Sequence, residues 1–274
     1  MSIIREVVKH EPATRLATVS AVGQPVPGIV RVTFTGSELV GFPSGGPTDH
    51  VKLYFADPEV EGPTNRTVTR DYTAREFRNV DDGTGFGSTP ELDIDFVIHQ
   101  EAGSSGPASA WASTAAAGDQ LRIAGPGKSK LAPTTISRVI LIADESALPA
   151  VTRWLRLLAP EVQVVALLEV ASVDVTPYFD AAALAERASV TWLYRSGAAG
   201  QAAGQVLAAL RALGPIGSDV YVFAAGEAGM LIPLRRYLRR ELGLPADQVA
   251  VNGYWKRGDE LFDHHAPLDA TDPD

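Results

Sequence analysis

The stretch Arg138-Val139-Ile140-Leu141-Ile142-Ala143 is apolar after its first residue, and acidic and hydroxyl residues follow it directly. Continuous apolar runs are typical of strands buried on both faces of a parallel sheet. Downstream, we expect further strands at 162–168, 190–194, 219–225 and 249–254, and helices at 148–158, 180–188, 205–213 and 230–242. Strands that alternate with helices in this way predict a doubly wound parallel sheet.

The residues before this run follow a different pattern. Short stretches rich in strand-forming residues are separated by Gly, Pro, Asp and Ser, and they lie at 15–19, 29–35, 50–55, 67–73, 91–98 and 120–123. Several short strands with such turn signals predict a barrel or a sandwich. One helix is expected at 107–115, with Pro107 in the usual place just inside its start.

A hinge between the two patterns is expected at Ala132-Pro133-Thr134-Thr135. We therefore predict a β-barrel domain over residues 1–132 and an α/β domain over residues 133–274. The chain from Asp259 onward is acidic, and we expect this tail to fray. The adjacent His264 and His265 lie in the tail, where solvation is the expected state rather than metal binding.

The composition excludes several classes of function. A net charge of −9 argues against a general nucleic-acid-binding protein, which needs a basic surface. The absence of cysteine excludes disulfides, thiolate catalysis and the usual iron–sulfur clusters. The first residues lack the apolar core of a signal peptide, and no run approaches the roughly 18 apolar residues of a membrane span. We expect a cytoplasmic monomer that does not insert into membranes.

The run from Arg66 to Arg75 combines cations, hydroxyls and one aromatic ring within an expected strand. Strand alternation places Arg70 and Tyr72 on one face and Thr73 on the other. These side chains suit a flavin, because the ring can lie against the isoalloxazine, the hydroxyl can meet its polar edge, and the guanidinium can pair with the pyrophosphate. The alternative is an exposed edge strand with a half-buried tyrosine.

A second motif lies where the strand ending at His99 gives way to a Gly/Ser loop and then to the helix that starts at Gly106-Pro107. Unsatisfied N–H groups at a helix N-terminus form a ready site for a pyrophosphate. The alternative is an ordinary capped loop with His99 as a hydrogen-bonded residue at the strand end.

The segment Gly125-Pro126-Gly127-Lys128-Ser129 ends like a phosphate-binding P-loop, but that motif needs a glycine where this chain has Arg122. A helix should also follow, and Pro133 interrupts the chain instead. We therefore reject a nucleoside triphosphatase and keep Lys128 and Lys130 as local positive charge.

Three further motifs lie after expected strands of the second half, where parallel sheets bind ligands. They are the turn 144–150, the glycine-rich end 224–229 and the aromatic and basic segment 252–258, in which Trp255 can stack on a flat ligand. The alternatives are an N-cap with helix-dipole acids for the first and a hydrophobic lid for the last. Arg239 and Arg240 suit compensation of a helix dipole.

In order along the chain, these motifs resemble those of the siderophore-interacting protein family over essentially the whole length. The family patterns Thr-Arg-x-Tyr-Thr-x-Arg, Asp-x-x-x-His, Gly-Pro-Ala-Ser-x-Trp-Ala, Asp-Glu-x-Ala-Leu-Pro-Ala, Ala-Gly-Glu and Gly-Tyr-Trp stand at 69–75, 95–99, 106–112, 144–150, 225–227 and 253–255. One departure concerns Gly127-Lys128, where many relatives read Arg-Gly, so the cation has moved by one residue.

The resemblance implies a ferredoxin reductase-like fold, with FAD on the barrel and a reduced nicotinamide on the α/β half. The implied FAD contacts are Arg70, Tyr72, Thr73, His99, Gly106, Pro107, Ala108, Ser109 and Trp111. The implied nicotinamide contacts are Asp144, Ala147, Gly226 and Glu227. A ferric siderophore would be held by basic residues, for which the best matches are Lys52, Lys128, its rival Lys130, and Lys256.

We interpret the chain as an FAD-dependent reductase that uses NAD(P)H to reduce Fe(III) in a ferric siderophore, with the flavin rather than a side chain carrying the redox chemistry. Acidic residues at Glu169 and Asp174 disfavour a 2′-phosphate, so NADH is favoured over NADPH, and reduced ferredoxin is another candidate donor. Two alternatives are a general flavin or electron-transfer reductase of the same fold and a non-catalytic module that binds a ferric chelate.

Overall fold

The computed structural model describes residues 2–56, 67–81, 87–98, 106–195, 199–259, 262–263 and 266–272, without the side chains of residues 199–203. The chain divides into two compact units. Residues 6–132 together with Thr152–Trp154 form one unit, called the barrel unit below. Met1–Arg5, Pro133–Val151 and Leu155–Asp274 form the other, called the α/β unit.

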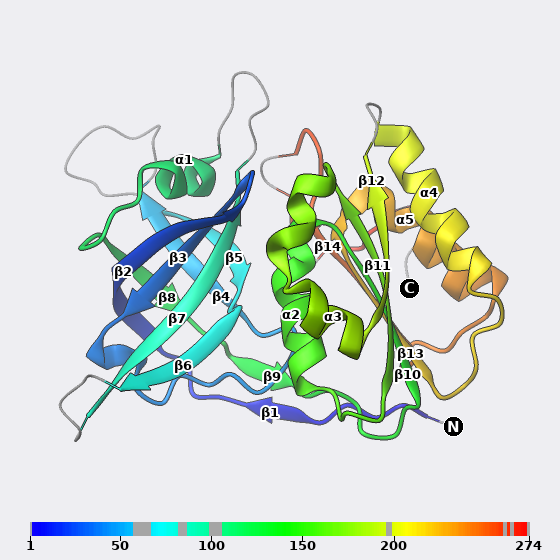
Figure 1. Cartoon of the computed structure of the whole chain (residues 1–274), viewed down its shortest axis with the longest axis horizontal. Helices are drawn as coiled ribbons and strands as arrows, with labels where there is room; N and C mark the ends of the chain where they lie inside the picture. Colours follow the sequence, from blue (N-terminus) through cyan, green and yellow to red (C-terminus); the bar gives the residue numbers. More distant parts are fainter. Residues whose placement is uncertain are drawn as a thin grey trace. The chain divides into compact units, whose positions relative to one another are not determined.

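The barrel unit is built on a seven-stranded antiparallel sheet in the order β5-β4-β8-β2-β3-β7-β6 (Figure 1). Its strands are β2 (Thr14–Val26), β3 (Ile29–Thr35), β4 (His50–Ala56), β5 (Thr67–Thr73), β6 (Glu76–Asp81), β7 (Ser88–Val97) and β8 (Gln120–Ala124), with the short helix η1 (Ser37–Leu39) after β3. Alternate side chains such as Phe34, Leu53 and Phe96 are fully buried and fill the interior. Helix α1 (Pro107–Thr114) packs on this core through Trp111.

Two short strands form a separate antiparallel ladder within the barrel unit. β1 (Val7–Lys9) pairs with β9 (Lys128–Lys130), and Lys9 lies directly opposite Lys128. Ser129, between the two lysines of β9, is buried.

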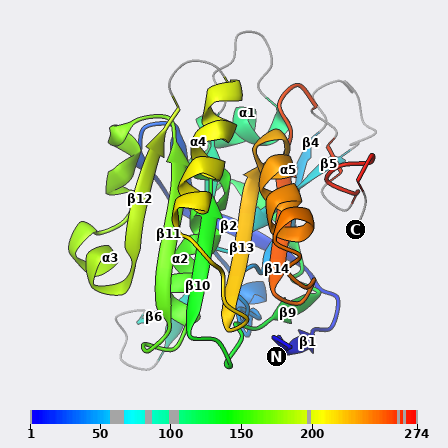
Figure 2. The same ribbon diagram turned by 90° about the vertical axis from the view of Figure 1, so that its right-hand side faces the viewer.

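The α/β unit contains a five-stranded sheet in the order β12-β11-β10-β13-β14, with every pair parallel. Figures 1 and 2 show α2 and α3 on one face of this sheet and α4 and α5 on the other. The elements are β10 (Arg138–Ala143), η2 (Glu145–Ala147), α2 (Leu148–Leu157), β11 (Gln163–Val170), η3 (Val173–Tyr178), α3 (Ala181–Arg187), β12 (Ser189–Tyr194), α4 (Ala199–Ala212), β13 (Val220–Glu227), α5 (Ala228–Arg236), η4 (Tyr237–Glu241) and β14 (Val249–Trp255). The strand order reverses between β10 and β13, and the carboxyl ends of strands at such a switch point are where ligands bind.

The predicted barrel and doubly wound sheet are confirmed, and the sandwich alternative is not. β3, β5 and β10 begin and end at the predicted residues. The strands β1, β6 and β9 were not predicted. β1 and β9 are too short to show alternation, and β6 carries charged residues on an exposed edge.

The expectation that the acidic tail frays is wrong for residues 266–272. Asp269 pairs with Arg236 at 3.0 Å, and Asp272 pairs with Arg235 at 3.2 Å and with Arg240 at 2.6 Å. Leu268 packs against the core cluster of the α/β unit. Arg240 therefore holds the tail as well as lying at a helix end, whereas His264 and His265 lie outside the described residues.

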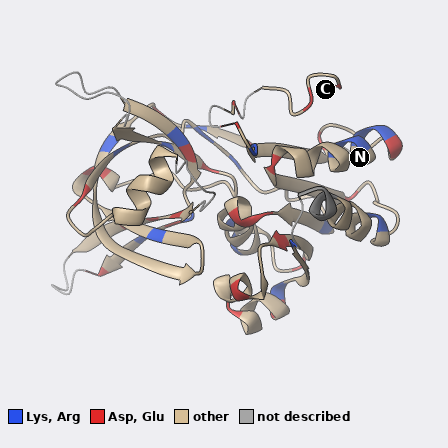
Figure 3. Ribbon diagram, turned by 90° about the horizontal axis from the view of Figure 1, so that it is seen from above, with Lys and Arg blue, Asp and Glu red and all other residues tan. Residues whose placement is uncertain are grey.

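Charged residues are distributed over both units. Figure 3 shows basic and acidic positions interspersed along the ribbon. Within the described part of the chain, no helix has both the length and the apolar character needed to span a bilayer.

Candidate functional site

Strand β5 carries the arginine, tyrosine and threonine that the sequence singles out. The Tyr72 ring packs against Phe96 with ring centroids 4.5 Å apart, and burial raises the pKa of Tyr72, so its hydroxyl stays protonated. Arg70 donates to the carbonyl oxygen of Thr69 at 2.9 Å, and Thr73 is buried at the strand end. A neutral ring, a hydroxyl and a cation within four residues fit the aromatic, polar and anionic parts of a flavin nucleotide.

The start of α1 is left without a side-chain cap. Gly106 occupies the N-cap position and Pro107 the first turn, while Ser109 donates to the carbonyl of Val97 at 3.1 Å instead of capping. A Cβ at Gly106 would meet none of the described atoms within 4 Å. The amide groups of this first turn, which includes the buried Ala108, are therefore suited to an anion such as a pyrophosphate.

Trp111 packs among aromatic side chains of the barrel core and is not an exposed ring on which a ligand could stack. Its indole lies parallel to Phe34, with ring centroids 6.1 Å apart, and also contacts Phe55 and Phe96. The ring therefore joins α1 to the barrel core. His99, the other aromatic candidate of this motif, lies outside the described residues.

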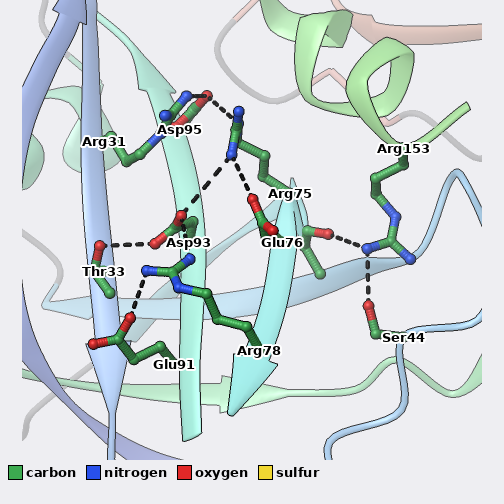
Figure 4. Close-up of polar contacts among 11 residues, drawn as sticks. Arg31, Thr33, Ser44, Arg75, Glu76, Arg78, Glu91, Asp93, Asp95 and Arg153 are labelled. Atoms are coloured by element: carbon green, nitrogen blue, oxygen red, sulfur yellow. Dashed lines mark hydrogen bonds and ion pairs between the residues drawn. The ribbon is translucent and has the colours of Figure 1, made fainter. Parts of the chain in front are cut away.

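A network of arginines and carboxylates covers the outer face of β3, β6 and β7 (Figure 4). Arg31 makes a bidentate pair with Asp95 at 2.7 and 2.9 Å, and Arg78 reaches Asp93 at 2.7 Å. Arg75 lies between them, 3.4 Å from Asp95 and 3.9 Å from Asp93. Sequence reasoning named Asp95 and Arg75 but missed the rest, although the cross-strand register of Arg31 opposite Asp95 explains the strongest pair.

Arg153 is a second group that sequence reasoning missed. Its guanidinium is fully buried in the barrel unit and donates to the carbonyl of Gly46 at 2.6 and 2.9 Å, to that of Ala74 at 2.8 Å and to Ser44 Oγ at 2.8 Å (Figure 4). Ala74 follows Thr73 directly, so this side chain fixes the backbone at the end of β5.

In the α/β unit, Asp144 lies at the carboxyl end of β10, next to the switch point of the sheet. Its carboxylate accepts the Ser146 amide at 2.9 Å, the Glu227 amide at 2.8 Å and Trp255 Nε1 at 2.8 Å. Burial and the neighbouring Glu145 carboxylate raise the pKa of Asp144 despite these bonds. The structure thus joins candidate residues at the carboxyl ends of β10, β13 and β14.

Gly226 allows this close approach. It has φ 146°, and a Cβ at this position would lie 2.6 Å from the Asp144 carboxyl carbon. Glu227 then caps α5 by accepting the Met230 amide at 2.8 Å, and Ala147 is fully buried in η2. Backbone groups and buried positions, rather than free side chains, thus dominate the surroundings of Asp144.

Glu145, Glu169 and Arg195 link the carboxyl ends of three neighbouring strands. Arg195 makes two bonds to Glu145, at 2.5 and 2.7 Å, and lies 3.4 Å from Glu169. Burial raises the pKa of Glu169 to about 7 even though Arg195 opposes the shift. Both carboxylates therefore pair with the Arg195 guanidinium. The sequence does not predict this cluster, because Arg195 lies one residue beyond the expected strand.

The four candidate lysines are not equivalent. Lys52 pairs with Asp71 at 2.7 Å, so part of its charge is already balanced. Lys128 lines a pocket of about 420 Å³ in the barrel unit, and Lys130 follows on the same exposed edge of β9. Lys256 lies in the α/β unit just beyond β14, where its backbone forms an isolated antiparallel β-bridge with that of Asp259.

Both halves of the chain match known families. Residues 61–130 match the family described as the siderophore-interacting FAD-binding domain, and residues 136–258 match the family described as siderophore-interacting protein. These two matches together extend over most of the barrel strands and the whole parallel sheet.

Individual relatives agree with this. The chain is 31% identical to the ferric vibriobactin reductase ViuB of Vibrio cholerae, over 86% of this chain and 87% of that protein. It is also 31% identical to the NADPH-dependent ferric-chelate reductase of Escherichia coli, over 90% of this chain and 95% of that one. The crystal structure of a siderophore utilization protein from T. fusca superposes with a TM-score of 0.79 at 36% identity, covering 96% of this chain and 100% of that one. The chain belongs to the siderophore-interacting protein family.

Proposed function

We propose that this protein is an FAD-dependent reductase that uses a reduced nicotinamide to reduce Fe(III) in a ferric siderophore. The observation that carries the proposal is strand β5, where Arg70, Tyr72 and Thr73 lie within the segment that matches the FAD-binding family. The names of the relatives from Vibrio cholerae and Escherichia coli, both reductases of ferric complexes, support the same reaction class.

On this proposal, the barrel unit holds FAD through the residues of β5 and α1. Arg70 and the amide groups after Gly106 would hold the pyrophosphate, and Tyr72 and Thr73 would contact the flavin ring system. FAD would supply the redox chemistry, which is hydride acceptance from the nicotinamide and single-electron transfer to iron. Arg153 would keep the end of β5 rigid, because its guanidinium donates to the carbonyl oxygen of Ala74, next to Thr73, at 2.8 Å.

The strand ends around Asp144 would bind the nicotinamide nucleotide. Ala147, Gly226 and Glu227 would contact it, and the indole of Trp255, fixed by its bond to Asp144, would stack on a ring. We favour NADH, because the two carboxylates around Arg195 disfavour a 2′-phosphate at the neighbouring strand ends.

The ferric chelate binds through cations, since the net charge of −9 would otherwise repel an anionic complex. Lys128 and Lys130 are the strongest candidates in the barrel unit, because Asp71 already balances part of the charge of Lys52.

The test is the visible spectrum of the purified protein, followed by additions without oxygen. We expect flavin bands that bleach with NADH and return on addition of ferric citrate or a ferric tris-hydroxamate. A colourless protein that cannot be reconstituted with FAD would contradict the proposal. Turnover with NADH, NADPH and reduced ferredoxin then identifies the donor, and a preference of tenfold or more for NADPH would refute our choice of NADH.

A further inference from the structure

The two-stranded ladder of β1 and β9 places like charges face to face. Lys9 is directly opposite Lys128, and both side chains are exposed. Like charges directly opposite one another destabilise an antiparallel pair. Within the described residues, no carboxylate pairs with either lysine, so the repulsion is not relieved by an ion pair there.

These lysines line a pocket together with two histidines. The pocket has a volume of about 420 Å³, and its walls are Lys9, His10, His50, Gly127 and Lys128. All five residues belong to the barrel unit, and none of them carries negative charge. A wall of two permanent cations and two imidazoles is suited to an anion rather than to a neutral or cationic ligand.

The orientation of His10 follows from the groups behind it. Asp49 Oδ2 accepts the Gly46 amide at 2.8 Å and faces Arg153 at 3.5 Å, so it acts as an acceptor toward Ser129. The Ser129 hydroxyl donates its one proton to Asp49 at 2.7 Å. The 2.8 Å contact between His10 Nε2 and Ser129 Oγ is therefore donated by the imidazole.

This order of donors has two consequences. A nucleophilic serine would have to give its proton to histidine, and Ser129 gives it to Asp49, so a hydrolytic triad is excluded. Since Nε2 of His10 is used by Ser129, Nδ1 is the ring nitrogen that remains for a ligand.

We propose that Lys9, His10, His50 and Lys128 form an oxyanion pocket that binds a phosphate or polycarboxylate anion of two or more negative charges. Such a ligand relieves the repulsion between the two lysines and accepts hydrogen bonds from both ammonium groups. Two sources share this chemistry: the anionic periphery of the ferric chelate and a free cellular anion. Only the first source rests on the proposed function.

The first experiment measures binding without any redox reaction. The chain contains five histidines, so its imidazole NMR signals can be followed while inorganic phosphate is added at pH 7.5, where phosphate is mainly the dianion. We expect a saturable shift of two signals, assigned with His10→Gln and His50→Gln. Lys9→Gln and Lys128→Gln should each weaken phosphate binding about tenfold by removing one charge-assisted hydrogen bond.

Arg122→Gln is the control, because it removes one positive charge from an exposed position of the barrel unit that does not line the pocket. It should change the phosphate affinity less than twofold. A shift that does not saturate, or that is equal in Lys128→Gln and Arg122→Gln, would overturn the proposal.

The second experiment distinguishes the two sources by steady-state reduction. If the chelate enters the pocket, phosphate competes with ferric citrate, and Lys128→Gln raises KM for ferric citrate but not for an uncharged ferric tris-hydroxamate. If a free anion is the ligand, phosphate binds equally well and neither KM changes. A protein that reduces no chelate at all would defeat the proposed function, while the NMR titration would still decide the pocket.

Discussion

Arg153 shows how one buried side chain can stabilise a whole loop region. We expect Arg153→Met to lower the free energy of unfolding by about 3 to 5 kcal/mol, because it leaves the carbonyls of Gly46 and Ala74 without their donor and the buried Asp49 carboxylate without its cation. Denaturant unfolding monitored by circular dichroism measures this. The exposed Arg156 on the same helix provides the control: Arg156→Met should cost less than about 1 kcal/mol, and equal losses in both variants would refute the assignment.

Some site residues could be predicted and others could not, for a physical reason. Asp144 and Gly226 follow apolar strands, and parallel strand ends meet at one edge of a sheet, so their proximity follows from local patterns. The partners of Arg153 are backbone carbonyls 107 and 79 positions away in the chain. Every residue has a carbonyl, so no residue type in the sequence marks such a contact.

At the scale of elements, the ends of β10, β11 and β12 are joined by a cluster that responds to pH. The pKa of Glu169 is raised from 4.5 to about 7 by burial. Below pH 4.5 both the folded and the unfolded state keep the proton, and between pH 4.5 and 7 only the folded state does. Ionisation of Glu169 therefore lowers the free energy of unfolding as the pH rises from 4.5 to 7, and the whole loss is present above pH 7.

We expect Glu169→Gln to be about 2 kcal/mol more stable than the wild type at pH 8 and equal to it near pH 4.5. Thermal unfolding across this range measures the difference. Glu145→Gln is the contrasting variant, because it breaks the bidentate pair with Arg195 and should destabilise the protein at pH 8. A Glu169→Gln variant that is less stable than the wild type at pH 8 would show that the carboxylate is favourable where it lies.

At the scale of the whole molecule, the distribution of charge decides whether an anionic substrate can bind. The protein has a net charge of −9, but the pocket that Lys128 lines is positively charged. Binding of an anionic chelate therefore depends on the local positive potential of these side chains. We expect Lys128→Glu to raise KM for ferric citrate about tenfold at low salt and about threefold in 0.5 M salt, where exposed charges are screened.

Bound FAD, read from the spectrum, should be unchanged in Lys128→Glu. Lys52→Glu places a carboxylate beside Asp71, so its effect should include a loss of stability that Lys128→Glu does not show. A salt-independent KM in the Lys128 variant would mean that charge is not what recognises the chelate.

The way the chain is divided between the two units has a consequence for protein engineering. A gene cut between Ala132 and Pro133 looks like a natural boundary, but it gives two incomplete fragments. The C-terminal fragment loses Met1–Arg5, and with it the bond from Arg5 to the Tyr221 hydroxyl at 3.0 Å. The N-terminal fragment loses Thr152–Trp154 and therefore Arg153. Domain shuffling among relatives should therefore transfer these two short segments together with the unit that each one completes.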